Sequence, residues 1–301
     1  MTDITILDGG MGKELRRIGA PFRQPEWSAL ALIEDPPSVV RAHRNFIDAG
    51  AQVIITSNYA VVPFHLGDER FDTDAVRLVD IAGRCAREAA DAVDRDVLVA
   101  GSLPPLFGSY EPDEFDPVRA APIYRDVVGA LAPHVDLWIA ETLSTIAEMQ
   151  TILGAIATID SALPMWMSFA VPNRFDDGTP ALRSGESLTE VADAIAERPV
   201  DAVLVNCSLP EQTGPSLHAH RSRLDDHGPG PVRTRRYAQA FPDLSPSGYR
   251  ANNLIFERRE EITPERYADV ATGWVRAGAT IVGGCCDMYP EHIAALSAHF
   301  A

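Results

Sequence analysis

The sequence predicts an α/β fold, and within that class a single (β/α)8 barrel of the TIM type spanning residues 1–301. Eight short apolar runs alternate with amphipathic stretches along the whole chain. This barrel typically has roughly 250 residues. The length of 301 residues therefore leaves enough chain for longer loops. No stretch has the composition of a linker between domains. A doubly wound open sheet is the alternative architecture.

The predicted strands are apolar runs rich in Val, Ile, Leu and Ala, each short enough for a buried parallel strand. Turn-forming or polar residues follow most of them. The eight strands are expected at Ile4–Leu7, Val53–Thr56, Val97–Ala100, Asp136–Ala140, Met165–Phe169, Ala202–Val205, Val232–Ala238 and Thr280–Gly283.

The predicted helices lie between these strands and show the amphipathic period of an α-helix. The helix from Pro264 has the clearest boundaries, because Thr263 precedes it as N-cap, Pro264 suits its first turn and Gly278 follows its end. The helices are expected at Pro37–Ala49, Thr73–Val93, Pro117–Ala132, Thr145–Ile159, Leu188–Glu197, more weakly Pro215–Leu224, then Pro264–Ala277 and Pro290–Phe300.

Four longer segments rich in polar residues, Pro or Gly follow predicted strands. In a barrel they would surround the mouth where active sites are built, and some would act as lids. They are Pro63–Asp72, Pro104–Asp116, Leu209–Gly230 and Phe241–Asn253.

The composition, 46% hydrophobic with 23% charged residues, is that of a folded soluble protein. The net charge is -17 and Lys13 is the only lysine, so nucleic acids and anionic membranes, which would be repelled, are excluded as partners. No apolar run approaches the roughly 20 residues of a membrane span, and the N-terminus lacks the features of a signal peptide. We therefore expect a cytoplasmic protein; the sequence says nothing of its oligomeric state.

Polar and metal-binding side chains follow the ends of several predicted strands. Asp8 follows the first strand, Tyr59 the second and Glu141 the fourth; Asn206 and Cys207 follow the sixth, and the run Gly283–Asp287 the eighth. Because the carboxyl ends of parallel strands share one rim of a barrel, these residues are expected to converge there.

The cysteines at this rim predict a metal site. Cys285 and Cys286 stand side by side and Cys207 occupies an equivalent position two strands earlier. Three thiolates suit a soft or borderline ion such as zinc and leave a fourth tetrahedral position open for a substrate. Neighbouring residues reach one ion only where the strand turns, and Gly283 and Gly284 are expected to supply that backbone freedom. The alternatives are small buried residues or a vicinal disulfide.

An open site of three thiolates favours chemistry on an incoming thiol. Its net charge of about -1 makes it a poor generator of hydroxide, but it can hold a thiol as a thiolate nucleophile. Asp8 and Glu141 could grip the amino group of an amino-acid thiol; as an alternative, either caps a helix or bonds nearby amides. If the chemistry is alkylation of that thiol, Tyr59 could shape the methyl-donor side of the site, approach the metal when substrate is absent, or be a plain rim aromatic. The glycines after Asp8 do not complete a dinucleotide-binding loop, because Leu15 stands where glycine or alanine is needed.

The sequence resembles the homocysteine S-methyltransferase family over nearly its whole length. The resemblance rests on four motifs and on a Pro-Glu-His-Ile run, namely Asp8-Gly9-Gly10-Met11-Gly12, Glu141-Thr142, Asn206-Cys207, Gly283-Gly284-Cys285-Cys286 and Pro290-Glu291-His292-Ile293. It implies a (β/α)8 barrel with Zn2+ on Cys207, Cys285 and Cys286, homocysteine bound to zinc through its sulfur, and its amino group held by Asp8 and Glu141. Together with these residues, we count Gly9, Tyr59 and Asn206 as candidate substrate-binding residues, and the three cysteines as catalytic.

The chain departs from the family pattern at positions near the mouth. The family usually has Thr in place of Lys13 and Gly in place of Asp287. The motif on the seventh strand reads Tyr237-Ala238-Gln239-Ala240-Phe241, and a Pro/Ser-rich segment follows it. These departures bear on the methyl donor and on the acceptor thiol, and they leave the zinc ligands unchanged.

The resulting hypothesis is a zinc-dependent methyltransferase that makes methionine from homocysteine and a small onium donor, S-methylmethionine or S-adenosylmethionine. Because we expect no second domain to carry folate or cobalamin, the donor is expected to be small. Betaine or another onium compound is the alternative donor, with only a weak aromatic cage in Trp27, Tyr59 and Phe64. Two rival classes are a barrel metal hydrolase, which would need histidine or carboxylate ligands, and a non-catalytic zinc or redox barrel.

Overall fold

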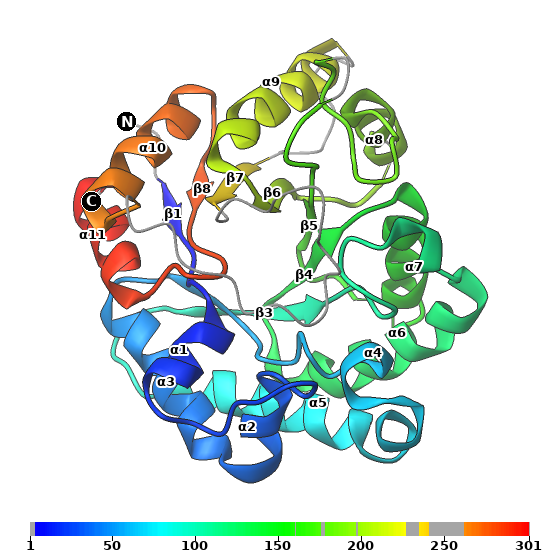
Figure 1. The fold of residues 1–301 in the computed structure, drawn as a ribbon, viewed down its shortest axis with the longest axis vertical. Coiled ribbons are helices and arrows are strands. Elements are labelled where there is room, and N and C mark those ends of the chain that lie inside the picture. Colours follow the sequence, from blue (N-terminus) through cyan, green and yellow to red (C-terminus); the bar gives the residue numbers. More distant parts are fainter. Residues whose placement is uncertain are drawn as a thin grey trace.

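The structure is a computed structural model that describes residues 4–300 except 160, 176–177, 197, 227–234 and 241–261. The predicted segment Phe241–Asn253 therefore lies outside the described residues. Figure 1 shows strands around the centre of the molecule and helices around its periphery. None of the described helices combines the length and the apolar character needed to cross a membrane.

Eight strands form one curled, all-parallel sheet in the order β1-β8-β7-β6-β5-β4-β3-β2. The α/β class with a parallel sheet is thereby confirmed, and the arrangement is consistent with a TIM-like barrel. The strands are β1 (Thr5–Ile6), β2 (Val53–Ile55), β3 (Leu98–Leu103), β4 (Leu137–Leu143), β5 (Met165–Phe169), β6 (Ala202–Ser208), β7 (Arg235–Ala240) and β8 (Ile281–Val282).

The two outer strands of this order, β1 and β2, approach each other beyond their ends. Leu7 forms an isolated parallel bridge with Val53. The Asp8 amide donates to the Val53 carbonyl at 3.0 Å, and the Gln52 amide donates to the Ile6 carbonyl at 2.8 Å. The curl of the sheet thus brings the first and second strands side by side.

Helices cover the outside of the sheet. They are α1 (Met11–Arg17), α2 (Ala29–Glu34), α3 (Pro36–Asp48), α4 (Pro63–Leu66), α5 (Asp68–Asp91), α6 (Pro117–Leu131), α7 (Ile146–Ala157), α8 (Leu188–Ile195), α9 (Pro210–Asp226), α10 (Pro264–Arg276) and α11 (Pro290–Phe300), with short 3-10 turns at Pro112–Glu114 and Ala132–His134.

Two of the predicted mouth loops are helical instead. Pro63–Asp72 forms α4 and the first turn of α5, because Pro63 suits a helix start and Gly67, with φ of 73°, permits the break between the two helices. Leu209–Gly230 contains α9 from Pro210 to Asp226, so the weak helix expected at Pro215–Leu224 is real but longer.

The boundaries of α10 match the expected signals. The Thr263 side chain accepts a hydrogen bond from the Arg266 amide at 3.2 Å, with Pro264 in the first turn. Gly278, with φ of 103°, follows the helix end. These local signals determine where α10 ends and the chain continues into β8, the strand that precedes the cysteine turn.

The sheet separates two layers of apolar side chains. One layer fills the inside of the curl and contains Leu7, Val53, Ala100, Leu137, Ile139, Trp166, Ala202, Leu204 and Ile281. The other packs between the sheet and the helices. Alternation along β4 illustrates the division, since Leu137 and Ile139 belong to the inner layer and Trp138 to the outer. The filled interior leaves the strand ends as the place for a site.

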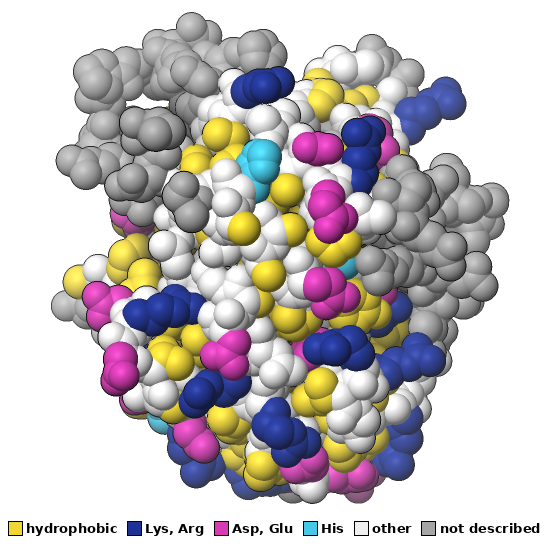
Figure 2. Space-filling view, turned by 90° about the vertical axis from the view of Figure 1, so that its left-hand side faces the viewer, with side chains coloured by type: hydrophobic (Ala, Val, Ile, Leu, Met, Phe, Trp, Pro, Cys, Tyr) yellow, Lys and Arg dark blue, Asp and Glu magenta, His cyan; other side chains and the backbone are white. Residues whose placement is uncertain are grey.

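Charged side chains of both signs are interspersed on the face shown in Figure 2, with apolar atoms between them. The strong negative charge of the chain, -17, is therefore not gathered into one acidic patch on this face. Its distribution there is that of a solvated surface.

Candidate active site

A pocket of about 200 Å³ opens where several strands end. Its walls come from segments far apart in the sequence: residues 8–13 after β1, residues 55–57, 59 and 60 at and after β2, Glu141 and Thr142 on β4, Cys207 on β6 and residues 284–287 after β8. Seven of the eight candidate residues line it, namely Asp8, Gly9, Tyr59, Glu141, Cys207, Cys285 and Cys286. Asn206 is not part of the wall.

The cysteine turn is fastened to the end of β1. The Gly284 amide donates to the Asp8 carbonyl at 2.8 Å, and the Gly10 amide donates to the Met288 carbonyl at 2.9 Å. The Tyr267 hydroxyl on α10 donates to the Gly283 carbonyl. These bonds hold the backbone on both sides of Cys285 and Cys286 in a fixed register with Asp8.

The glycines after Asp8 and those before Cys285 allow close packing and do not supply unusual backbone angles. Neither Gly283 nor Gly284 has positive φ, so the expected role of backbone freedom is not what these two residues supply. A Cβ on Gly284 would lie 2.4 Å from Met288 Cβ, and one on Gly10 would lie 2.5 Å from the Cys285 carbonyl oxygen. The two motifs are therefore glycine-rich because their backbones touch.

We expect Gly10→Ala to damage the cysteine turn. Since the new methyl group would collide with backbone rather than with a movable side chain, the turn must shift, at a cost of roughly 1–3 kcal/mol in the free energy of unfolding. Thermal denaturation and metal content measure the effect. Gly12→Ala is the matched control, because its Cβ would meet only side-chain atoms, the nearest at 3.4 Å, within helix α1. A Gly10→Ala protein with wild-type stability and wild-type metal content would contradict this reading.

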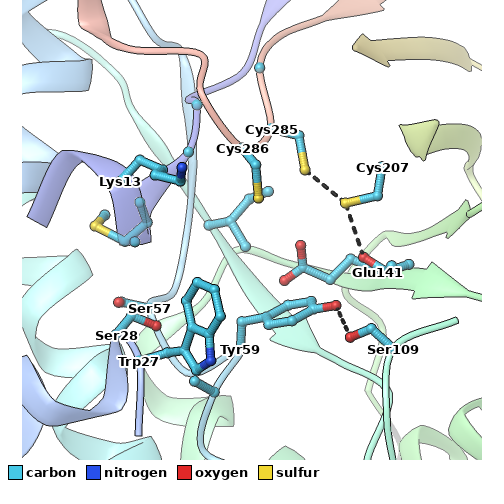
Figure 3. A pocket seen from close by; sticks show the side chains of 18 of the residues that line it. Lys13, Trp27, Ser28, Ser57, Tyr59, Ser109, Glu141, Cys207, Cys285 and Cys286 are labelled. Atoms are coloured by element: carbon cyan, nitrogen blue, oxygen red, sulfur yellow. Dashed lines mark hydrogen bonds between the residues drawn. The ribbon is translucent and has the colours of Figure 1, made fainter. Parts of the chain in front are cut away.

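Two of the three thiols at the pocket are in contact. Cys207 Sγ and Cys285 Sγ are 2.8 Å apart, and both residues are free cysteines (Figure 3). Thr142 Oγ1 and Asn206 Nδ2 approach the Cys207 sulfur at 3.7 and 3.5 Å. Hydrogen bonding from Cys285, with further bonds from Tyr110 and Thr142, lowers the pKa of Cys207. Cys207 is thus the thiol of the pair that ionises first.

The Cys286 thiol lies beside this pair in Figure 3, and hydrogen bonds with Cys207 and with Cys286 raise the pKa of Cys285 well above its usual value. Within the residues that the structure describes, no three Cys, His, Asp or Glu side chains are arranged in a way that could hold a metal ion. The fold thus brings the three thiols to one pocket, with Cys285 in contact with both of the others. As a donor set, three thiols on one wall fit a soft or borderline divalent ion.

Asp8 and Glu141 place two carboxyl groups at the same pocket. Asp8 is 2% exposed and accepts a hydrogen bond from the Ile55 amide at 2.8 Å. Burial raises its pKa well above the usual value, and the nearby Glu141 raises it further. Burial likewise raises the pKa of Glu141 to about 7, although Ser102 donates to it at 2.5 Å. Two desolvated carboxyl groups that repel each other would be relieved by a cation between them.

Tyr59 and Asn206 differ in how they relate to the pocket. The Tyr59 hydroxyl lies 2.5 Å from Ser109 Oγ, and burial raises its pKa well above the usual value. Asn206 turns inward: Nδ2 donates to Thr142 Oγ1 at 2.9 Å, while Oδ1 accepts from the Thr142 amide at 3.1 Å and from Ser168 at 2.8 Å. Asn206 therefore holds Thr142, which has φ of 63°, beside Cys207.

The segment between α1 and α2 supplies aromatic residues that strand-end motifs did not reveal. Phe22, Trp27 and Ser28 line the pocket, and Phe22 packs edge-on against Trp27 with ring centroids 5.6 Å apart. The only sequence signal was the aromatic character of Trp27. From the loop after β3, Ser109 and Tyr110 also reach the wall; they belong to Pro104–Asp116, a segment expected around the mouth, although no motif singled out either residue.

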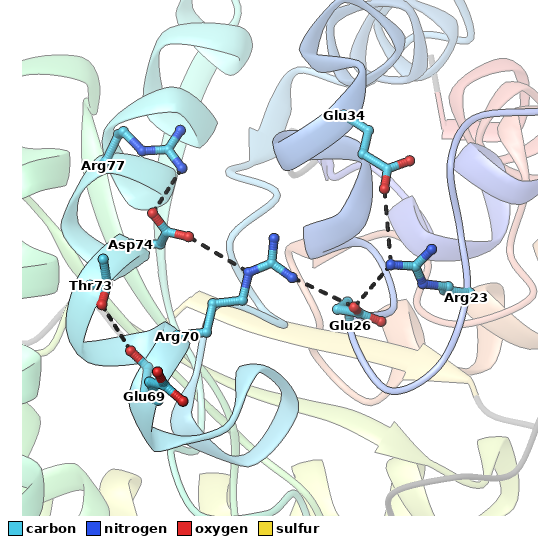
Figure 4. A network of polar contacts seen from close by, with 8 residues as sticks. All are labelled: Arg23, Glu26, Glu34, Glu69, Arg70, Thr73, Asp74 and Arg77. Carbon is cyan, nitrogen blue, oxygen red and sulfur yellow. Dashed lines mark hydrogen bonds and ion pairs between the residues drawn. The ribbon is translucent and has the colours of Figure 1, made fainter.

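An ion-pair network beside Trp27 ties this segment to α5 (Figure 4). Glu26 pairs with Arg23 at 3.3 Å and with Arg70 of α5 at 3.6 Å, and Arg70 also pairs with Asp74 at 3.6 Å. The arginines are partly exposed, so each pair contributes only about 0–1 kcal/mol. The network orients the segment that carries Trp27 more than it stabilises the fold.

Comparison with known proteins identifies what this chain is similar to. The family model described as homocysteine S-methyltransferase matches residues 5–300. A homocysteine S-methyltransferase of Escherichia coli is 30% identical, over 98% of this chain and 95% of that protein. A selenocysteine methyltransferase of Astragalus bisulcatus is 28% identical, over 96% of this chain and 90% of that protein.

The fold comparison agrees. A crystal structure of the homocysteine methyltransferase MmuM from Escherichia coli in its metallated form superposes with a TM-score of 0.75 at 27% identity, covering 98% of this chain and 96% of that one. The arrangement of strands and helices is thus shared along essentially the whole length of both chains.

Proposed function

The chain belongs to the homocysteine S-methyltransferase family, and from that premise we propose that it forms methionine by moving a methyl group from a small onium donor to the sulfur of homocysteine. The observation that carries the proposal is the meeting of three thiols and two desolvated carboxyl groups in one pocket. Thiols suit a sulfur-directed metal ion, and the carboxyl groups suit the ammonium group of an amino acid.

We propose Zn2+ as the metal and Cys207, Cys285 and Cys286 as its ligands. A donor set of sulfur fits zinc better than magnesium or calcium, which prefer oxygen. When bound, such an ion supplies one thing, a lowered pKa for a coordinated thiol. The protein holds Cys207 ready for ionisation through its bonds from Cys285, Tyr110 and Thr142, and Asn206 supports Thr142 from behind.

The carboxyl groups of Asp8 and Glu141 would hold the ammonium group of homocysteine. Both are desolvated and near each other, so a cation between them lowers their mutual repulsion. Gly9 adds backbone to the same wall, and only glycine fits there because a Cβ would strike the Met288 carbonyl oxygen at 2.3 Å.

The reaction that these residues would serve is one in-line displacement. The deprotonated sulfur of homocysteine attacks the methyl carbon and forms the new S–C bond. The bond between that carbon and the donor's onium atom breaks, its electron pair stays on the onium atom, and the donor leaves as a neutral thioether or amine. The pocket contributes by holding the two substrates in line.

An onium donor fits the aromatic part of the wall. Trp27, Phe22 and Tyr59 line the pocket, and a cation over an aromatic face is attracted by the ring. S-methylmethionine or S-adenosylmethionine is the proposed donor, and betaine is the alternative.

We also propose that residues 1–301 are one homocysteine-binding domain with a closed eight-stranded barrel. The family match over residues 5–300 supports a single unit, and the hydrogen bonds that join Asp8 to Val53 and Gln52 to Ile6 support closure between β1 and β2. The four unpaired cysteines suit a reducing compartment such as the cytoplasm.

A panel of donors and acceptors tests the function. Protein shown to hold zinc is expected to form methionine from homocysteine with S-methylmethionine or S-adenosylmethionine, and more slowly with betaine. Mass spectrometry of the products with a deuterated methyl group follows the transfer, and selenocysteine and cysteine serve as competing acceptors. If zinc-loaded protein methylates no thiol or selenol with any onium donor, the barrel is a non-catalytic zinc or redox protein instead.

A further inference from the structure

A buried ion pair forms part of the pocket wall. Lys13 Nζ on α1 lies 3.0 Å from Asp287 Oδ1 in the cysteine turn, and the two side chains are 13% and 3% exposed. Both residues line the pocket. Burial of such a pair is costly in free energy unless each group is well satisfied, which is the reason to ask what the pair does there.

One oxygen of this pair has no partner. Asp287 Oδ2 is buried and accepts no hydrogen bond from any residue that the structure describes, while Oδ1 faces Lys13. A buried acceptor without a donor is rare in folded proteins because its desolvation is not compensated. Since Asp287 lines the pocket, a ligand that carries an N–H or O–H group would supply the missing donor.

The pair has the charge pattern of a receptor for a zwitterion. The Lys13 ammonium attracts a carboxylate, and Asp287 Oδ2 accepts from a primary ammonium group. The ammonium group of the acceptor is already assigned to Asp8 and Glu141 in the proposed function. Figure 3 shows Lys13 and Glu141 on different sides of the Cys286 thiol. The amino-acid end that meets Lys13 therefore belongs to the other substrate, the methyl donor.

We propose that Lys13 and Asp287 are specificity-determining residues that bind the α-amino-acid end of the methyl donor. This inference rests on the proposed function. It makes the enzyme selective for sulfonium donors with a primary ammonium group, such as S-methylmethionine. Betaine and dimethylsulfonioacetate have a carboxylate but no N–H group, so they leave Asp287 Oδ2 without a donor.

The backbone at Asp287 determines which substitution tests this. Asp287 has φ of 61°, in the left-handed region where glycine is free of strain and alanine is not. Asp287→Gly removes the carboxyl group without adding backbone strain, and Asp287→Asn keeps the shape while removing the charge. Lys13→Met keeps the length of the side chain in α1 and removes its charge.

The experiment compares kcat/KM for S-methylmethionine and for dimethylsulfonioacetate at saturating homocysteine, in zinc-loaded protein. Loss of a hydrogen bond to a charged group corresponds to about a 10- to 100-fold effect. Asp287→Gly is expected to lower kcat/KM for S-methylmethionine by that factor, mainly through KM, and to change the value for dimethylsulfonioacetate little. Lys13→Met is expected to lower both values, because both donors have a carboxylate. Equal losses on both donors in Asp287→Gly would show a merely structural role and overturn the proposal.

A binding measurement separates this inference from the proposed function. Calorimetric titration of each donor into protein without homocysteine needs no turnover. If wild type binds S-methylmethionine at least tenfold more tightly than Asp287→Gly does, the inference stands even where no methyl transfer occurs. If methyl transfer occurs but Asp287→Gly binds both donors as wild type does, the inference is wrong and the proposed function stands.

Discussion

Cys207→Ala is expected to lose its metal and nearly all of its activity. Only two thiols would remain at the pocket, and two ligands do not retain a zinc ion against dilution. The bound metal should fall far below one ion per chain, and kcat/KM for methyl transfer should fall by roughly 1,000-fold or more, since a metal that lowers a thiol pKa contributes several kcal/mol to a reaction at sulfur. Metal analysis by mass spectrometry and the methyl-transfer assay measure the two effects.

Cys85→Ala is the matched control. Cys85 is buried on α5 outside the pocket, its thiol donates to the Pro36 carbonyl at 3.6 Å, and burial raises its pKa to about 11. Its loss should leave metal content and activity unchanged. Stoichiometric zinc retained in Cys207→Ala would rule out the three-thiolate site, whatever the activity.

The sequence located the strands best where burial alone decides the structure. Met165–Phe169 is entirely buried and its bounds agree with β5 to the residue, because a continuous apolar run between polar residues has few alternatives. The helix α1 was not predicted, since Gly12 and the short run from Met11 to Arg17 carry a weak helical signal. Its N-cap, Gly10, packs against the cysteine turn, a contact between distant segments that no local pattern reveals.

The residues that follow the predicted strands indicated the pocket correctly, because the carboxyl ends of all parallel strands lie at the same rim. Seven of the eight candidate residues line one pocket, although their roles stay proposals. The contacts between side chains on different segments of the pocket could not be predicted from the sequence. The contact of Lys13 with Asp287 joins positions 13 and 287, and the inward bonds of Asn206 to Thr142 depend on a three-dimensional neighbour that no local pattern reveals.

Glu141 should control both homocysteine binding and its pH dependence. Burial raises the pKa of Glu141 to about 7, so the carboxyl group is largely neutral at pH 6 and ionised at pH 8. Only the ionised form pairs strongly with an ammonium group. In wild type, KM for homocysteine is therefore expected to fall as pH rises from 6 to 8. In Glu141→Gln this dependence should weaken, because only Asp8 remains to pair with the ammonium group, and kcat/KM for homocysteine at pH 8 should fall by roughly 100-fold, as for a buried charge left without its partner.

The same titration should make the folded protein less stable as pH rises, although it improves homocysteine binding. Because the folded pKa of Glu141, about 7, lies above the ordinary value of 4.5, the folded protein binds more protons than the unfolded chain between these pH values. The stabilising contribution of the protonated group is full below about pH 4.5 and is lost as pH rises through 7, which amounts to roughly 3 kcal/mol. Glu141→Gln removes this penalty, so the metal-free variant should melt at a higher temperature than wild type at pH 8.

Glu148→Gln separates the binding role of Glu141 from its burial. Burial also raises the pKa of Glu148 to about 7, but this residue accepts from the Ser144 and Thr145 amides at the start of α7 and does not line the pocket. Its replacement should alter melting behaviour and leave KM for homocysteine as in wild type at every pH. Higher stability together with weaker homocysteine binding, seen only in Glu141→Gln, identifies a carboxyl group whose burial is maintained for the substrate. Unchanged homocysteine kinetics in Glu141→Gln would show that Glu141 does not bind the substrate.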